Sequence, residues 1–69
     1  MKKIFLNVGE LRKRAAENYL SQVELSKAAG ISYQRMNEIY RRDSIPIRET
    51  SLMKLAKVLN CKPSNLLMV

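Results

Sequence analysis

Amide and guanidinium side chains recur at helical spacing between positions 33 and 41. On a helical wheel with Met36 at zero, three polar residues lie at about 140–200°, opposite the apolar side: Gln34, Glu38 and Arg41. The flanks of this face are also polar, with Tyr33 and Asn37 on one side and Arg35 on the other. A helix of residues 33–41 would therefore present one face that can make paired hydrogen bonds.

These residue types match the edges of DNA bases in the major groove. Gln34 and Asn37 can each pair with N6 and N7 of adenine, and Arg41 can contact guanine or hold a phosphate. Tyr33 offers a ring to a thymine methyl group. Glu38 either accepts from cytosine N4 or orients Arg41 or Arg35 through an ion pair at helical spacing. All five are candidate base-reading residues, although any amphipathic helix has a polar outer face.

A second set of residues is suited to the phosphate backbone. Gln22 stands where a helix should begin, so its amide and the helix dipole can both face a phosphate. Arg42 and Arg48 bracket the segment after residue 41, where the backbone should pass. Ser32 and Arg35 complete the phosphate candidates. The run Arg12–Arg14 is equally explained as a solvated helix face.

The local signals around these residues predict two short helices joined by a tight turn. Ser21 with Glu24 forms a capping-box pattern, Gly30 ends the first helix, and Ser32 caps the second. Leu25 and Ala28 are expected to face inward from the first helix, and Met36, Ile39 and Tyr40 from the second. With Ile31 filling the turn, residues 21–40 have the pattern of a helix-turn-helix.

The rest of the chain supplies the elements that would support this unit. Residues 2–6 form an edge-strand candidate, with which Met68 and Val69 could pair. Asn7 and Glu10 predict the start of a helix that ends near Asn18 in a left-handed conformation. Residues 41–48 are expected to be a basic loop. A further helix is predicted by an apolar stripe that consists of Leu52, Leu55, Ala56 and Leu59. A last short helix is predicted over Pro63–Leu67, because proline is favoured at the first position of a helix.

Composition narrows the function classes. The 69 residues are expected to form one domain, and their 13 Lys and Arg against 6 Asp and Glu give a net charge of +7, which favours polyanionic partners. One cysteine, Cys61, and no histidine exclude an internal disulfide and a tetrahedral zinc site. We also expect no cofactor, no membrane-spanning segment, no small-molecule pocket and no catalytic constellation. The chain is expected to be cytoplasmic.

The sequence resembles the Cro/CI-type helix-turn-helix repressor family, in its small single-domain bacterial and phage members. The residues on which this resemblance rests are Ser21–Leu25, Ala29–Ser32, Leu52, Leu55–Ala56, Leu59–Pro63 and Leu66–Leu67. The resemblance implies an all-α, five-helix, lambda-repressor-like domain whose second and third helices bind DNA. It also implies that Gln22 matches the family's phosphate-binding glutamine. Operator-contact positions of the family fall on Ser32, Tyr33, Gln34, Asn37 and Glu38.

Two functions remain open at this point. The first is a transcriptional regulator that binds double-stranded DNA, as a repressor and as a homodimer on an inverted repeat. Ile45, Ile47 and the apolar C-terminus are its candidate dimer surfaces. The alternative is a protein-interaction module, such as an antitoxin or antirepressor partner, that keeps the fold without binding an operator.

Overall fold

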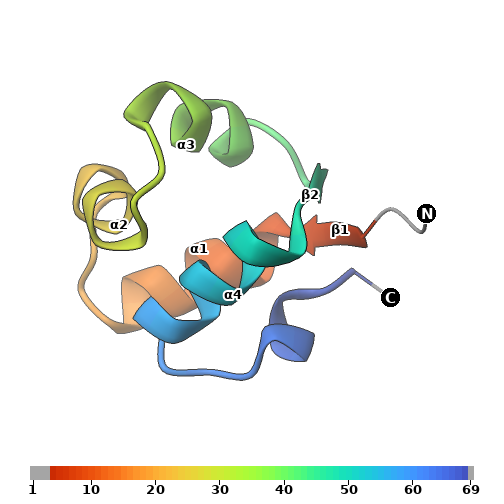
Figure 1. The fold of residues 1–69 in the computed structure, drawn as a ribbon. Coiled ribbons are helices and arrows are strands. Elements are labelled where there is room, and N and C mark those ends of the chain that lie inside the picture. Colours follow the sequence, from red (N-terminus) through yellow and green to blue (C-terminus); the bar gives the residue numbers. More distant parts are fainter. Residues whose placement is uncertain (1–3, 69) are drawn as a thin grey trace.

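The computed structural model of the protein describes residues 4–68 (Figure 1). Its elements follow in this order: β1 (Ile4–Asn7), α1 (Val8–Glu17), α2 (Gln22–Ala29), α3 (Tyr33–Tyr40), β2 (Ser44–Ile47), α4 (Glu49–Val58) and the 3-10 helix η1 (Pro63–Leu66). The expectation of five helices is therefore wrong, because the last helical segment is one turn of 3-10 helix and a small sheet accompanies the four α-helices.

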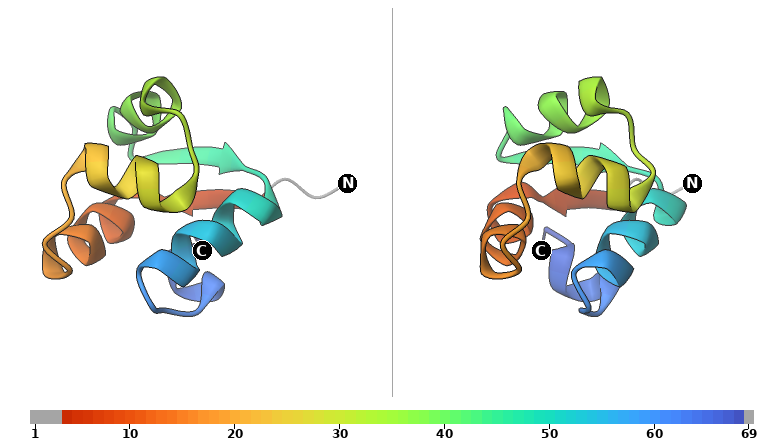
Figure 2. Two further views of the ribbon diagram at one scale, coloured as in Figure 1. Left: turned by 60° about the vertical axis from the view of Figure 1, so that its left-hand side comes forward. Right: turned by 90° about the vertical axis from the view of Figure 1, so that its left-hand side faces the viewer.

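One core holds the helices together. Its members are the inward residues of every element, each at most 3% exposed: Leu6, Val8, Leu11, Ala15, Leu25, Ala29, Met36, Ile39, Ile45, Leu52, Leu55, Ala56, Leu59 and Leu66. The views in Figures 1 and 2 show α3 at one edge of the molecule, with α4 and the C-terminal segment on the other side. The core thus supports α3 from its inner side and leaves its outer side to solvent.

The segment expected to be a basic loop contains a strand. β1 and β2 pair antiparallel, with Ile4 opposite Ile47 and Leu6 opposite Ile45. The prediction missed the alternation of Ile45 and Ile47 around Pro46, in which every second side chain faces the core. Because Ile45 is only 2% exposed, it is also unavailable as a dimer surface.

The expected pairing between the two chain ends is present in part. Leu67 forms an isolated antiparallel bridge with Leu6, and the Met68 N–H donates to the Phe5 carbonyl at 2.9 Å. Val69, Lys2 and Lys3, which belonged to the same expectation, lie outside the described residues.

Most helix ends follow the local signals, with two corrections. Asn18 has φ −96°, so it is not the left-handed residue; Tyr19 takes that conformation at φ 58°, while the Asn18 side chain donates to the Arg14 carbonyl. Ala28 is exposed, and Ala29 lies in the core in its place. Neighbouring helical residues point about 100° apart, so an error of one position moves a side chain from core to solvent.

Residues 4–68 contain neither a membrane-spanning helix nor a cluster of metal ligands. None of the helices in that range is long and apolar enough to cross a membrane. The same range holds no group of three metal-ligating side chains.

Candidate nucleic-acid interface

The α2–α3 unit is built by capping and by a glycine turn. The Ser21 side chain accepts from the Glu24 N–H at 3.2 Å, and the Glu24 carboxylate accepts from the Ser21 N–H at 3.0 Å. Gly30 then reverses the chain at φ 69°, a conformation that side chains disfavour. The Ile31 N–H donates to the Ser26 carbonyl at 2.9 Å, which closes the turn. The capping box fixes the start of α2, and the glycine turn ends α2 and leads the chain into α3.

Packing divides α3 into two faces. Met36 and Ile39 are 0% and 1% exposed, and they anchor the helix to the core. Tyr40 is half-buried and packs at the margin. Burial raises the pKa of the Tyr40 phenol, and the nearby Arg12 charge opposes that rise in part. A neutral phenol at this place adds packing without adding charge.

The outer face of α3 carries the predicted base-reading residues. Four of these five lie exposed on α3 or at its end: Tyr33, Gln34, Glu38 and Arg41. The fifth, Asn37, is half-buried, and its Oδ1 accepts a long hydrogen bond, 3.4 Å, from Nε2 of Gln22. The structure thus brings a predicted phosphate contact and a predicted base contact together across two helices.

An ion pair accounts for the acidic residue on this face. Arg35 Nη1 lies 3.1 Å from Glu38 Oε1, and Arg35 Nη2 donates to the Pro46 carbonyl at 3.4 Å. Sequence spacing offered Glu38 as a partner for this arginine. The pair reduces the local negative charge and ties α3 to β2.

The remaining phosphate candidates occupy the ends of elements beside α3. Ser32 is the N-cap of α3, and its hydroxyl accepts from the Arg35 N–H at 3.2 Å. Arg42 lies in the turn after α3, and Arg48 is the N-cap residue of α4. Both arginines are exposed, and neither forms an ion pair with another residue in the range 4–68.

The basic run of α1 has partners of its own. Nη2 of Arg12 lies 4.0 Å from Oδ1 of Asp43, and Nε of Arg14 lies 3.4 Å from Oε1 of Glu10 on the same helix. Lys13 is exposed. These contacts favour the interpretation of this run as a helix face with local ion pairs.

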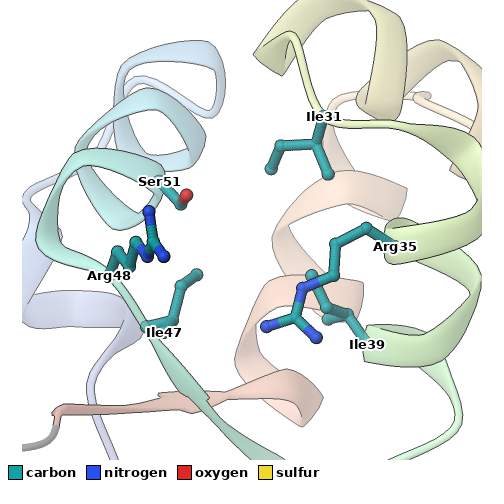
Figure 3. A pocket seen from close by; sticks show the side chains of 6 residues that line it. All are labelled: Ile31, Arg35, Ile39, Ile47, Arg48 and Ser51. Atoms are coloured by element: carbon teal, nitrogen blue, oxygen red, sulfur yellow. The ribbon is translucent and has the colours of Figure 1, made fainter.

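Sequence reasoning missed a hollow beside α3, which Figure 3 shows. Its volume is about 390 Å³, and its lining comes from the α2–α3 turn, α3, the end of β2 and the start of α4: Ile31, Arg35, Ile39, Ile47, Arg48 and Ser51. The hollow forms where β2 runs into α4 opposite α3. The hollow was not predicted because residues 41–48 were expected to be a loop and not to contain a strand. The alternation of apolar residues in that segment was the signal that indicated the strand.

Two short helices pack on the core, a tight glycine turn joins them, and the second helix keeps one polar face exposed. These features define the helix-turn-helix class of DNA-binding domain. A family model described as a Cro/C1-type HTH DNA-binding domain matches residues 10–69, and the chain belongs to this family.

Solved structures agree on the fold. The chain is similar to the restriction-modification controller protein C.AhdI from Aeromonas hydrophila, with a TM-score of 0.74 and 22% identity, over 84% of this chain and 86% of that one. It is also similar to the transcriptional regulator VanUg, with a TM-score of 0.73 and 18% identity, over 99% of this chain and 88% of that one. Comparison with curated proteins gave no match.

Proposed function

We propose that this chain is a sequence-specific transcriptional regulator that binds duplex DNA with α3 in the major groove. The observation that carries the proposal is the division of α3 between Met36 and Ile39, which are in the core, and an exposed outer face of bidentate side chains. Gln34 and Asn37 are assigned to base edges, together with Tyr33 and Arg41. The net charge of +7 supports a polyanionic partner.

The flanking groups are assigned to the phosphate backbone. Gln22 and Ser32 lie at the starts of α2 and α3, where helix dipoles favour an anion. Arg42 lies in the turn after α3, Arg48 is the N-cap residue of α4, and Arg35 lies on α3 itself. Glu38 orients Arg35 in this arrangement rather than contacting a base.

The first test is binding to random-sequence duplex DNA, measured by fluorescence anisotropy across a salt series. Affinity that falls steeply with salt would support the release of counterions from phosphates. The Gln34→Ala/Arg41→Ala double variant should bind much more weakly. Lys54→Gln is its control, because it removes the same single charge from an exposed position on α4. Absence of binding at low salt by a folded protein would refute the proposal.

We further propose that the protein is cytoplasmic and that it represses transcription. In this proposal it binds an inverted repeat as a homodimer. A protein bound over a promoter needs no added activity to block it, and two half-sites raise specificity beyond that of one module. Reporter expression with and without the protein, from a promoter carrying the selected site, would test repression. Increased expression would contradict it.

An apolar patch on the outer face of the sheet is the proposed dimer surface. Phe5 lies opposite Pro46 in the strand register, and Met68 is bonded to the Phe5 carbonyl. Phe5 and Met68 are 42% and 43% exposed. The sheet lies at the end of the molecule away from α2, so pairing there leaves the outer face of α3 free (Figure 1). Light scattering should show a dimer that Phe5→Ser weakens; a monomer with and without DNA would refute this part.

A further inference from the structure

We propose that the hollow between α3, β2 and α4 is a binding site for a small amphipathic carboxylate. The proposal rests on the combination of an apolar floor with two guanidinium groups at the rim, in one concave site. Its volume of about 390 Å³ falls in the range of small-molecule sites, roughly 300–1,000 Å³. It lies beside the reading face of α3.

The floor suits an apolar tail. Ile39 is buried, whereas Ile31 and Ile47 are half-buried and border the hollow from the α2–α3 turn and the end of β2. The three isoleucines present branched aliphatic surface to one space (Figure 3). A short alkyl chain placed there would remove that surface from water.

The rim suits a carboxylate head. Arg48 and Ser51 stand together on the α4 side, and Arg35 extends from α3 on the opposite side (Figure 3). Glu38 occupies Nη1 of Arg35, whereas Arg48 makes no ion pair within residues 4–68. A carboxylate between the two sides could accept charge-assisted hydrogen bonds from Arg48 and a hydrogen bond from the Ser51 hydroxyl. Charge complementarity therefore favours an anionic ligand over a cationic or neutral one.

Titration of the DNA-free protein with sodium octanoate, below its micelle concentration, tests this site directly. Isoleucine methyl NMR signals are the readout, because Ile31, Ile39 and Ile47 line the hollow and Ile45 does not. We expect saturable shifts at the first three and little change at Ile45. Affinity should rise about two- to fourfold per methylene from butyrate to octanoate. Acetate and octylammonium should produce no saturable shift.

Variants locate the head group. Arg48→Gln should weaken octanoate binding about tenfold through loss of the charge-assisted contact. Lys54→Gln removes one positive charge from α4 outside the hollow, so its affinity should match that of the unmodified protein. Circular dichroism would establish that both variants are folded. Equal weakening by the two variants, or shifts spread evenly over all isoleucines, would overturn the proposal.

Two further outcomes would assign the hollow to other occupants and overturn the carboxylate site. Shifts of the same three methyl groups on dilution of the protein alone would show that a second copy covers it. Binding of octylammonium as strongly as octanoate would show apolar adsorption without the arginines.

The position of the site has a consequence that rests on the proposed DNA-binding function. Arg35 and Arg48 are also proposed phosphate contacts, so octanoate should weaken DNA binding by the unmodified protein, and do so less for Arg48→Gln. The methyl titration contains no DNA, and its result therefore stands or fails separately from the regulator proposal.

Discussion

Replacement of Arg42 by glutamine should reduce the salt dependence of DNA binding without changing which sequence is preferred. Arg42 is exposed in the turn after α3, and its backbone N–H is held by the Ile39 carbonyl at 3.1 Å. It takes part in no ion pair within residues 4–68, so its charge is available to a phosphate. Glutamine keeps length and polarity and removes only the charge.

The magnitude follows from counterion release. Each neutralised phosphate contributes about 0.9 to the slope of log affinity against log salt concentration. Four arginines border the proposed interface in each protomer: Arg35, Arg41, Arg42 and Arg48. A dimer would therefore have a slope no steeper than about −7, and loss of Arg42 from both protomers would lower its magnitude by about 1.8. Between 50 and 200 mM salt, the affinity of Arg42→Gln should therefore fall by a factor roughly tenfold smaller than the affinity of the unmodified protein.

The assay is fluorescence anisotropy on the selected site and on random duplex across that salt range. Gln34→Ala, which removes no charge, should leave the slope unchanged and cost about 1–3 kcal/mol on the selected site alone. Lys54→Gln should change the slope much less than Arg42→Gln. If the two charge variants lower the slope equally, net charge governs binding and the reasoning from a localised interface is refuted.

Three other variants test the framework that positions α3. Met36→Ala should lower the free energy of unfolding by about 2–5 kcal/mol in urea, because it empties a fully buried site; a smaller loss would mean that α3 is not anchored there. Gly30→Ala should cost about 1–2 kcal/mol in the same assay, and Gly30→Asn less, because φ is 69° and nothing lies within 4 Å of an added Cβ; equal costs would contradict a purely backbone origin. The pKa of Glu24 is held below its ordinary value of 4.5, chiefly by the hydrogen bond from the Ser21 backbone, so Glu24 stabilises the fold above that pH and this contribution is lost as pH falls through the lowered pKa. Thermal melts of Glu24→Gln should accordingly depend less on pH below about 4.5 than those of the unmodified protein, and identical profiles would exclude this cap as a source of acid sensitivity.

Features set by neighbouring residues were predictable from sequence. The caps at Asn7, Ser21 and Ser32 each use a side chain and an N–H three residues apart, so no tertiary information is needed. The left-handed turn at Gly30 follows from the same local chemistry. The polar face of α3 was likewise readable from helical period, although its role in binding DNA stays a prediction.

Features set by distant residues were not predictable in this way. β2 depends on β1, whose residues lie about 40 positions earlier, and the interrupting Pro46 disguised its alternation. The end of α1 at residues 18–19 was also mispredicted, by one residue. Asparagine is the better left-handed residue in isolation, but here its side chain bonds the Arg14 carbonyl, and the exposed Tyr19 takes the turn. Tertiary pairing and competing hydrogen bonds decided these cases.

The contact between Gln22 and Asn37 links the two kinds of DNA contact that we propose. Asn37 Oδ1 accepts from Gln22 at one lone pair and keeps a second for a base donor, while its Nδ2 remains able to donate. The bidentate pattern needed for adenine is therefore compatible with the observed bond. A phosphate that fixes the Gln22 amide would in turn fix the orientation of Asn37. Register on the backbone and choice of base would then be coupled within the protein before any base contact forms.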